Sequence, residues 1–322
     1  MSVAAVIPHW NRVELLRGLL ENLRAQTRAF DRVIVVDNGS TDGSAAIAEQ
    51  MGAEVVRLPS NVGFAAAVNR GIAAAGDCEW VAILNNDVTL RPEWLARLLG
   101  SVGDAAFATG KILSAQDHSV IDGTWDEISR GGCAYRMGAG SKDGPAWGER
   151  RRIRMASMTA CLVRRSVFER VGQLDERFGS YLEDVDFGLR CVTYGLSGIY
   201  EPEAVAYHLG SSTLGRWHSD TVRLIARNQK LLVAKHFSGQ AGWPIVAGQL
   251  LWGLVALRHG CGSAWLRGRK AGRLLAREIK GARQIAGLGK ALAESEREIL
   301  ASQQRSGWDN YWRVYAWLAP LR

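Results

Sequence analysis

The sequence predicts an α/β fold with a mostly parallel central sheet, and two patterns lead to this prediction. Short apolar runs rich in β-branched residues alternate with longer runs whose apolar residues have helical spacing. Each apolar run ends at polar or turn-forming residues, as the strands of βα units do. The 322 residues, 47% hydrophobic and 22% charged, are enough to bury a large core.

The first hundred residues place these elements in order. Leucines 15, 16, 19, 20 and 23 share one helical face, and a second helix is alanine-rich. Buried strands separated by helices predict a parallel sheet with helices on both faces, and ligands of such sheets bind beyond the carboxyl ends of the strands. Two of those ends carry Asp37 and Asp87. The expected strands are 3–7, 33–36, 54–58 and 81–84, and the second helix is 63–75.

The rest of the chain changes character twice. Residues 114–153 are polar and glycine-rich, which predicts an irregular or mobile insertion. Strand-like and helical patterns then return, and from residue 220 onward the chain shows only helical patterns. We therefore expect an α/β domain over 1–236 and a helical C-terminal region over 237–322. The later elements expected before that region are a strand in 154–164, a helix over 183–194 and a strand over 204–207 that leads to His208.

Positive charge is concentrated in the C-terminal region. The whole chain has a net charge of +8, and residues 258–290 carry the same excess, nine basic residues against Glu278. Such a segment favours an anionic partner. The basic residues are Arg258, Arg267, Arg269, Lys270, Arg273, Arg277, Lys280, Arg283 and Lys290.

An apolar stretch rich in tryptophan, 241–257, precedes the basic segment. It has 17 residues and is interrupted by Pro244 and Gln249, whereas a membrane-spanning helix needs about 20. We expect it to lie on an anionic membrane surface rather than to span the bilayer. Nucleic-acid binding suits the charge less well because of the neighbouring apolar residues. A helical appendage that packs on the first domain or on a second subunit is the other alternative.

Cysteines and the N-terminus bear on the compartment. The five cysteines are far apart and form no C-x-x-C pair, so neither a zinc knuckle nor a disulfide framework is predicted. The first residues lack a basic segment followed by a long apolar one, which is the pattern of a secretory signal. We expect a protein of the cytoplasm, peripheral at the inner face of the membrane.

Two strand ends carry residues suited to a nucleotide and a metal ion. The run Asn85-Asn86-Asp87 follows a buried strand, and a carboxylate there can hold a divalent cation that bridges two phosphates. Asp37 could accept hydrogen bonds from a nucleobase or a ribose. Helix capping after Asp87 and a βα turn at Asp37 are the plain structural alternatives.

Further polar groups lie in later segments. Glu183, Asp184 and Asp186 fall within four residues, and clustered carboxylates suit a general base, although acidic residues also favour the first turn of a helix. His208 can bind manganese, although a lone histidine is often a packed core residue. The glycine-rich run 61–64 could let a helix N-terminus approach phosphate, but it lacks the G-x-G-x-x-G spacing of a dinucleotide site.

Five segments in this order together resemble one family. The chain is similar to the large family-2 glycosyltransferases of GT-A fold, especially their bacterial rhamnosyltransferase-like members, over about residues 1–236. The resemblance implies an inverting enzyme that moves rhamnose or another hexose from a nucleotide diphosphate to an acceptor hydroxyl. The segments are VVDNGSTDGS, NVGFAAAVNRG, LNNDV, YLEDVDFGLR and the one containing His208.

The resemblance also implies roles by position. Asp184 would be the general base, with Glu183 beside it. Asp87 would be the main carboxylate ligand of Mn²⁺ or Mg²⁺, with His208 as a further ligand. The run 85–87 stands where the family has Asp-x-Asp, so its first Asp is replaced by Asn. The nucleotide would be bound around Pro8, Asp37, Asn61, Gly63, Asn69, Arg70, Asn85 and Asn86.

The partners follow from the same resemblance. The donor would be a dTDP- or UDP-sugar, and the acceptor a saccharide or a lipid-linked precursor of a cell-surface polysaccharide. A homo-oligomer stays open. Two other classes compete: a non-catalytic nucleotide-sugar-binding or scaffold protein, and a dinucleotide-dependent oxidoreductase, against which the missing G-x-G-x-x-G argues.

Overall fold

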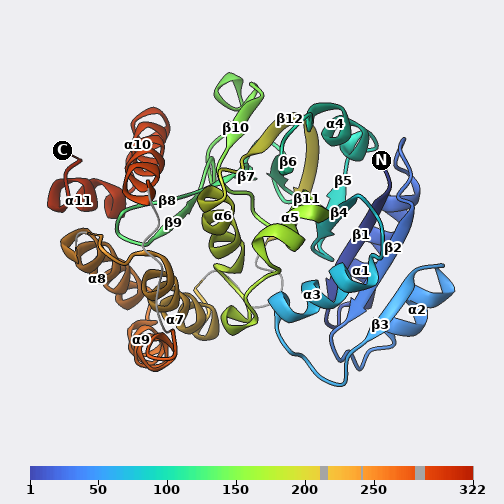
Figure 1. The fold of residues 1–322 in the computed structure, drawn as a ribbon, viewed down its shortest axis with the longest axis horizontal. Coiled ribbons are helices and arrows are strands. Elements are labelled where there is room, and N and C mark those ends of the chain that lie inside the picture. The colour runs from blue at the N-terminus through green and yellow to red at the C-terminus, as the bar shows by residue number, and fades with distance from the viewer. Residues whose placement is uncertain (211–216, 241, 280–286, 322) are drawn as a thin grey trace. The chain divides into compact units, whose positions relative to one another are not determined.

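The computed structural model describes residues 1–210, 217–240, 242–279 and 287–321 (Figure 1). Its contacts divide the chain into two compact units. The sheet unit comprises Met1–Trp125 and Gly138–Gly210, and the helical unit comprises Asp126–Met137 and Ser211–Arg322. The second unit therefore includes a short segment that interrupts the first one in the sequence.

The sheet unit is built on a ten-stranded sheet in the order β10-β12-β6-β11-β4-β1-β2-β3, with β5 on β12 and β7 on β6. Strands β3, β2, β1 and β4 are parallel, as are β6 and β12, while β11 is antiparallel to both neighbours. The predicted α/β fold is thus confirmed. The strands are β1 Val3–His9, β2 Arg32–Asp37, β3 Glu54–Arg57, β4 Trp80–Leu84, β5 Val88–Leu90, β6 Phe107–Ser114, β7 Ile121–Gly123, β10 Arg151–Ile153, β11 Ala160–Arg164 and β12 Gly198–His208.

Six α-helices accompany this sheet (Figure 1). The leucine face expected on the first helix is buried, as hydrophobic burial requires. The alanine-rich helix α3 approaches the sheet closely, because a Cβ at Gly71 would lie 2.2 Å from a methyl carbon of Val6. The helices are α1 Val13–Arg24, α2 Ser44–Gln50, α3 Phe64–Ala74, α4 Trp94–Ser101, α5 Arg165–Val171 and α6 Glu183–Thr193.

The segment 114–153, expected to be irregular, contains short ordered elements instead. Besides β7 and β10 it holds β8 Asp126–Ile128, β9 Ala134–Arg136 and the 3₁₀ turn Pro145–Trp147. Trp125 packs against Trp147 and Tyr200, with ring centroids 5.9 and 5.1 Å apart. A few large aromatic side chains thus order a segment whose glycines and polar residues hide any periodic pattern.

The helical unit contains five described helices and the β8–β9 hairpin. Arg130, in the hairpin's turn, forms an ion pair of 2.7 Å with the buried Glu296 of α10, which also accepts a hydrogen bond from the Tyr315 hydroxyl. The part of the chain that the structure describes contains no helix with the length and hydrophobicity of a membrane span. The helices are α7 Ser219–His236, α8 Gly242–Arg258, α9 Gly262–Ala276, α10 Leu288–Ser306 and α11 Asn310–Leu318.

The position of α7 differs from the expected division at residue 236. Gly268 and Gly272 of α9 allow this helix to pack closely on α7. A Cβ at Gly268 would lie 2.2 Å from the carbonyl oxygen of Arg223, and a Cβ at Gly272 would lie 2.5 Å from that of Arg227. This backbone contact makes α7 part of the helical unit. The assignment of separate domains to 1–236 and 237–322 stays a prediction.

Candidate functional site

The carboxyl ends of β1 and β2 bring the first predicted residues together. His9 pairs with Asp37 and Pro8 with Val36 in the parallel register. The buried carboxylate of Asp37 accepts a hydrogen bond of 3.1 Å from the backbone N–H of Ser40. Asp37 therefore stabilises the turn after β2, and its remaining acceptor capacity is available at the strand end.

A buried histidine that the sequence did not single out holds the Asn85–Asp87 run. Nδ1 of His9 lies 2.8 Å from Nδ2 of Asn86. Burial lowers the pKa of His9 to about 4, although Asp42 and Asp37 oppose this shift, so the ring is neutral near pH 7. The Asn86 amide must therefore donate to Nδ1, which leaves the proton on Nε2. His9 orients Asn86 at the end of β4.

The two predicted metal ligands lie side by side. Nε2 of His208 is 3.2 Å from Oδ1 of Asp87. The register explains this, because His208 at the end of β12 stands opposite Val88 of β5, the residue that follows Asp87. Both side chains are nearly buried. Asp87 and His208, 121 positions apart in the sequence, are thus neighbours at one sheet edge.

A third side chain fixes the imidazole. Nδ1 of His208 lies 2.9 Å from Oδ2 of Asp122, which belongs to β7. Burial alone would lower the pKa of His208, but hydrogen bonds to Asp122 and Asp87 raise it to about 9. Asp122 was not predicted as a site residue, because it lies in the segment 114–153 that we expected to be irregular.

These residues fit a metal ion with two protein ligands. Among the described residues, no three His, Cys, Asp or Glu side chains converge on one point, because Asp122 contacts the far nitrogen of the ring. Two adjacent ligand atoms on an octahedral ion with bonds near 2.1 Å are about 3 Å apart, close to the 3.2 Å between Asp87 and His208. A carboxylate that holds the second nitrogen is the usual support of a metal-binding histidine.

The glycine-rich loop before α3 makes contacts within the protein. Asn38 donates to Asn61 and accepts from the N–H of Val62. Gly63 has φ +92°, and a Cβ there would lie 3.1 Å from Gly179. The N–H groups of Phe64 and Ala65 donate to Ser180 and Gly179. The first amides of α3 thus hold the segment before α6, rather than being left for a phosphate.

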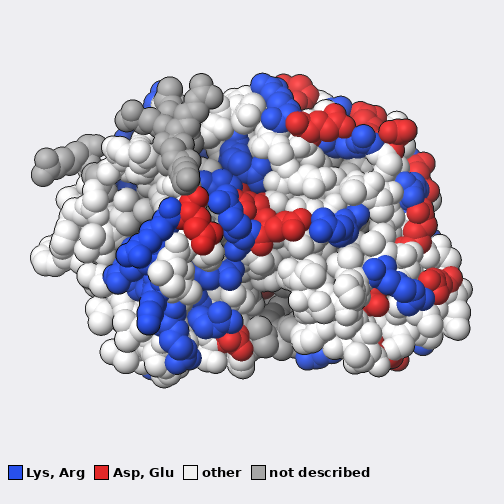
Figure 2. Space-filling model, turned by 60° about the horizontal axis from the view of Figure 1, so that its bottom comes forward, with Lys and Arg blue, Asp and Glu red and all other residues white. Residues whose placement is uncertain are grey.

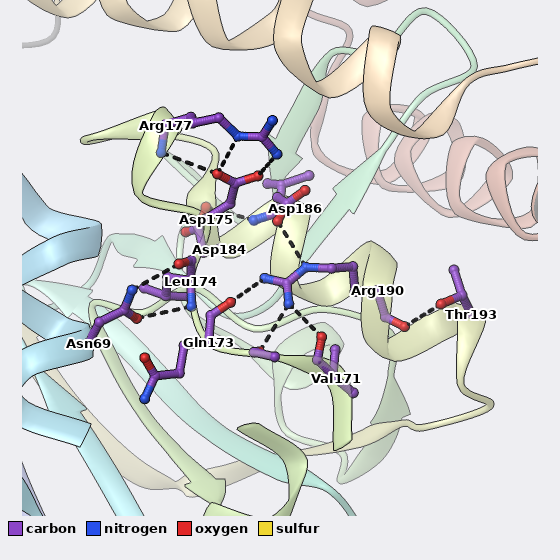
Figure 3. Close-up of polar contacts among 12 residues, drawn as sticks. Asn69, Val171, Gln173, Leu174, Asp175, Arg177, Asp184, Asp186, Arg190 and Thr193 are labelled. Carbon is purple, nitrogen blue, oxygen red and sulfur yellow. Dashed lines mark hydrogen bonds and ion pairs between the residues drawn. The ribbon is translucent and has the colours of Figure 1, made fainter. Parts of the chain in front are cut away.

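Asn69 and Arg70 hold the same segment, as Figure 3 shows for Asn69 and Leu174. The buried Asn69 amide donates to the Leu174 carbonyl (2.9 Å) and accepts from its N–H (3.0 Å). Nδ2 of Asn69 also lies 3.1 Å from Glu176, which pairs with Arg70 at 3.3 Å. In this structure the side chains of Asn69 and Arg70 contact other residues of the protein, so their role in nucleotide binding stays a prediction.

The three carboxylates of α6 differ in their surroundings. Asp186 is fully buried and paired with Arg190 at 3.0 Å. Figure 3 shows the Arg190 guanidinium also donating to the carbonyl groups of Val171 and Gln173, both at 2.8 Å. Asp186 is thus committed to the fold, and Glu183 is buried beside it on the first turn.

Asp184 is the most accessible of the three. It is partly exposed and lines a small cavity with Phe107, Phe187 and Met158. Tyr181 and Leu182, just before α6, have φ values of +73° and +67°. Non-glycine residues rarely adopt this conformation, and such strain concentrates at functional sites. Asp184 lies in the first turn of α6, close to this strained backbone, and its role as a general base stays a prediction.

Comparisons with known proteins identify the family of the chain. The profile described as Glycosyl transferase family 2 matches residues 4–172. The chain is 31% identical, over 76% of its length and 87% of the relative's, to the N-acetylglucosaminyl-diphospho-decaprenol L-rhamnosyltransferase of Mycobacterium tuberculosis. It is 29% identical to the pre-mycofactocin glycosyltransferase of the same species, over 95% of this chain and 62% of that protein.

Two solved structures share the fold. GalNAc-T7, solved with UDP, GalNAc and Mn²⁺, matches with a TM-score of 0.65 and 13% identity, over 96% of this chain and 58% of that one. The mannosyltransferase PcManGT of Pyrobaculum calidifontis, in complex with GDP-Man and Mn²⁺, matches with a TM-score of 0.54 and 18% identity, over 98% and 85%. The predicted GT-A fold is confirmed.

The chain belongs to glycosyl transferase family 2, and it is a glycosyltransferase. The resemblance read from its five sequence segments is confirmed. The roles of individual site residues stay predictions.

Proposed function

We propose that the protein moves a sugar from a nucleotide diphosphate to an acceptor hydroxyl in a single inverting displacement. The observation that carries this proposal is the adjacency of Asp87 and His208, 3.2 Å apart at the carboxyl ends of the strands. Ligands of proteins with parallel sheets bind at these strand ends. A carboxylate beside an imidazole suits a cation that bridges two phosphates.

The proposed roles follow from the contacts. Asp87 and His208 would hold Mn²⁺ or Mg²⁺, which when bound would offset the negative charge that develops on the leaving diphosphate. Asp37 would accept from the nucleoside. The Asn85 carboxamide oxygen, buried and without a hydrogen-bond partner in the described part of the chain, would accept from the donor. Asp184 would take the proton of the attacking hydroxyl.

The donor and acceptor are proposed from the relatives. One is an L-rhamnosyltransferase whose name specifies a diphospho-decaprenol acceptor. By analogy, we assign this chain a dTDP- or UDP-linked rhamnose or other hexose and a lipid-linked or saccharide acceptor. A lipid-linked acceptor agrees with a cytoplasmic enzyme at the inner membrane face, working as a monomer or a homo-oligomer.

A transfer assay with manganese and a panel of dTDP- and UDP-sugars tests this function. We expect turnover with an inverted anomeric centre, and no turnover in excess chelator. Asp184→Asn keeps the shape but removes the proton acceptor, so kcat should fall about 100-fold or more with donor binding nearly unchanged. Glu14→Gln, at an exposed carboxylate of α1, is the matched control. Full turnover in excess chelator would contradict the metal requirement. An unchanged kcat in Asp184→Asn would contradict the role of Asp184 as the general base.

A further inference from the structure

Helix α8 carries a row of exposed apolar side chains. The positions advance by three or four residues, so at about 100° per residue they lie within an arc of roughly 80° on one helix face. Residues on the other faces, such as Ala247, Gly253 and Ala256, are buried. The row is Trp243, Val246, Leu250, Leu254 and Leu257, with exposed fractions of 56%, 46%, 49%, 61% and 64%.

This apolar row continues onto α11. The indole N–H of Trp243 donates to the carbonyl of Leu318 over 2.8 Å, which places the start of α8 beside the end of α11. Trp317 of α11 is 79% exposed and Val314 is 40% exposed. A contiguous apolar surface on a folded protein usually marks an interaction site.

Helix α9 mixes exposed leucines with basic residues on one face. Leu266 and Leu274 are 61% and 54% exposed. Lys270 and Arg273, with Arg277 at the C-cap of the helix, share their face by the same helical spacing. Within the described ranges none of these three basic residues has an ion pair. Helix α9 follows α8 directly and packs on it through Trp265, whose ring meets Gly253.

The positive charges on α7 and α9 are crowded. Burial, with Arg269 and Arg273 nearby, lowers the pKa of Lys230 to about 8. The pKa of Arg269 is lowered by burial and by Arg273. Figure 2 shows Lys and Arg gathered in a belt, with a largely uncharged surface beside it on the left, the side on which Figure 1 draws α8. A concentration of cations of this kind favours an anionic ligand.

We propose that these faces of α8, α9 and α11 form a docking face for an anionic phospholipid bilayer. The apolar row enters the boundary between headgroups and acyl chains, and the basic residues of α9 contact lipid phosphates. Apolar and basic residues on neighbouring faces, with tryptophans among them, are typical of helices that lie in the membrane interface. A symmetric subunit interface is disfavoured, because it would bring the basic residues of α9 against those of a second copy, and like charges repel. The docking face deepens the proposed function, since it would bring the enzyme to a lipid-linked acceptor.

Vesicle co-sedimentation of the full chain tests the docking face. The probes are phosphatidylcholine vesicles with and without phosphatidylglycerol, at low and high salt. We expect binding to the anionic vesicles that weakens with salt. Charge reversal in Lys270→Glu/Arg273→Glu should reduce the partition coefficient at least tenfold, and so should Leu250→Ser/Leu254→Ser. These side chains are exposed, so the variants should fold. Lys142→Glu, an exposed charge of the sheet unit, is the control and should bind like the wild type.

Several outcomes would overturn the docking face: no binding to either vesicle, equal binding to both, or variants that bind like the wild type. Size-exclusion chromatography with light scattering measures the oligomeric state of the same variants. If the wild type does not bind vesicles and forms a dimer that Leu250→Ser/Leu254→Ser loses, the face belongs to a second copy of the chain. Sugar transfer to a water-soluble acceptor distinguishes a failure of the docking face from a failure of the proposed function. The docking variants should retain this transfer activity. A chain that binds vesicles but transfers no sugar would contradict the proposed function alone.

Discussion

At the scale of single residues, the sequence indicates ligands better than it indicates their supports. Asp87 and His208 follow apolar strands, and this position made both candidates. Asp122 holds His208 and His9 holds Asn86, but neither supporting residue has a local signal in the sequence. Asp122 contacts a residue 86 positions away, and His9 one 77 positions away. Only the sheet register brings them together, and a single sequence does not display register.

Replacing Asp122 should weaken metal binding. Its carboxylate accepts from Nδ1 of His208 and so directs Nε2 toward Asp87. We expect Asp122→Ala to lower Mn²⁺ affinity about 10- to 100-fold, with a smaller loss in Asp122→Asn, whose amide oxygen can still accept. Electron paramagnetic resonance of free Mn²⁺ measures this without turnover. Asp117→Asn, in the neighbouring loop, should bind as the wild type does; equal affinity in Asp122→Ala would contradict the orienting role.

Stability should fall in mild acid because of His9. Its pKa is about 4 in the folded chain and 6.5 as the unperturbed value, so the unfolded state binds the proton first. The stabilisation is complete above pH 6.5 and is lost as the pH falls toward 4, by up to about 1.4 kcal/mol per pH unit.

Urea unfolding at pH values across this window measures the effect. His9→Gln should flatten the dependence of the unfolding free energy on pH. His118→Gln, at an exposed histidine, should leave the dependence as in the wild type. Parallel curves for the wild type and His9→Gln would show that another group governs the acid response.

At the scale of helices and strands, periodicity predicted most elements within a few residues. The helices at 63–75 and 183–194 correspond to α3 and α6. What the pattern could not predict is which side chains serve the fold. Asn69 belongs to a family motif and was expected at the nucleotide, yet its partner Leu174 lies 105 positions away and occupies its amide. Asp186, one of three clustered carboxylates, is taken by Arg190.

Glycine-to-alanine substitution should have opposite effects on stability at a packed position of α9 and at an open position of α1. Gly272→Ala would place a Cβ 2.5 Å from the Arg227 carbonyl oxygen and force the helices apart, which should destabilise by about 1–3 kcal/mol. Gly18→Ala, in α1 with nothing within 4 Å of its Cβ, should stabilise by about 0.5–1 kcal/mol. Thermal unfolding measures both changes. A neutral or stabilising Gly272→Ala would contradict the close helix contact.

At the scale of the whole molecule, the two units are interleaved in sequence. The hairpin β8–β9 lies between β7 and β10 along the chain but belongs to the helical unit. Its contacts there include the ion pair of Arg130 with Glu296 and an edge-to-face contact of Tyr135 with Trp312 at 5.5 Å. Along the chain, the helical unit is therefore entered twice, which a sequence read from one end to the other does not show.

This interleaving predicts how the chain responds to truncation. A chain that ends at residue 210 keeps the hairpin but loses Glu296 and Trp312. It would then expose Ile128, which is fully buried in the complete chain, and leave Arg130 without its carboxylate. We expect this truncated chain to aggregate or to unfold at a lower temperature than one in which residues 126–137 are also replaced by a glycine–serine linker. Light scattering and thermal unfolding compare the two. If the hairpin makes no difference, its attachment to the helical unit contributes nothing to stability, and the units are separable at residue 210.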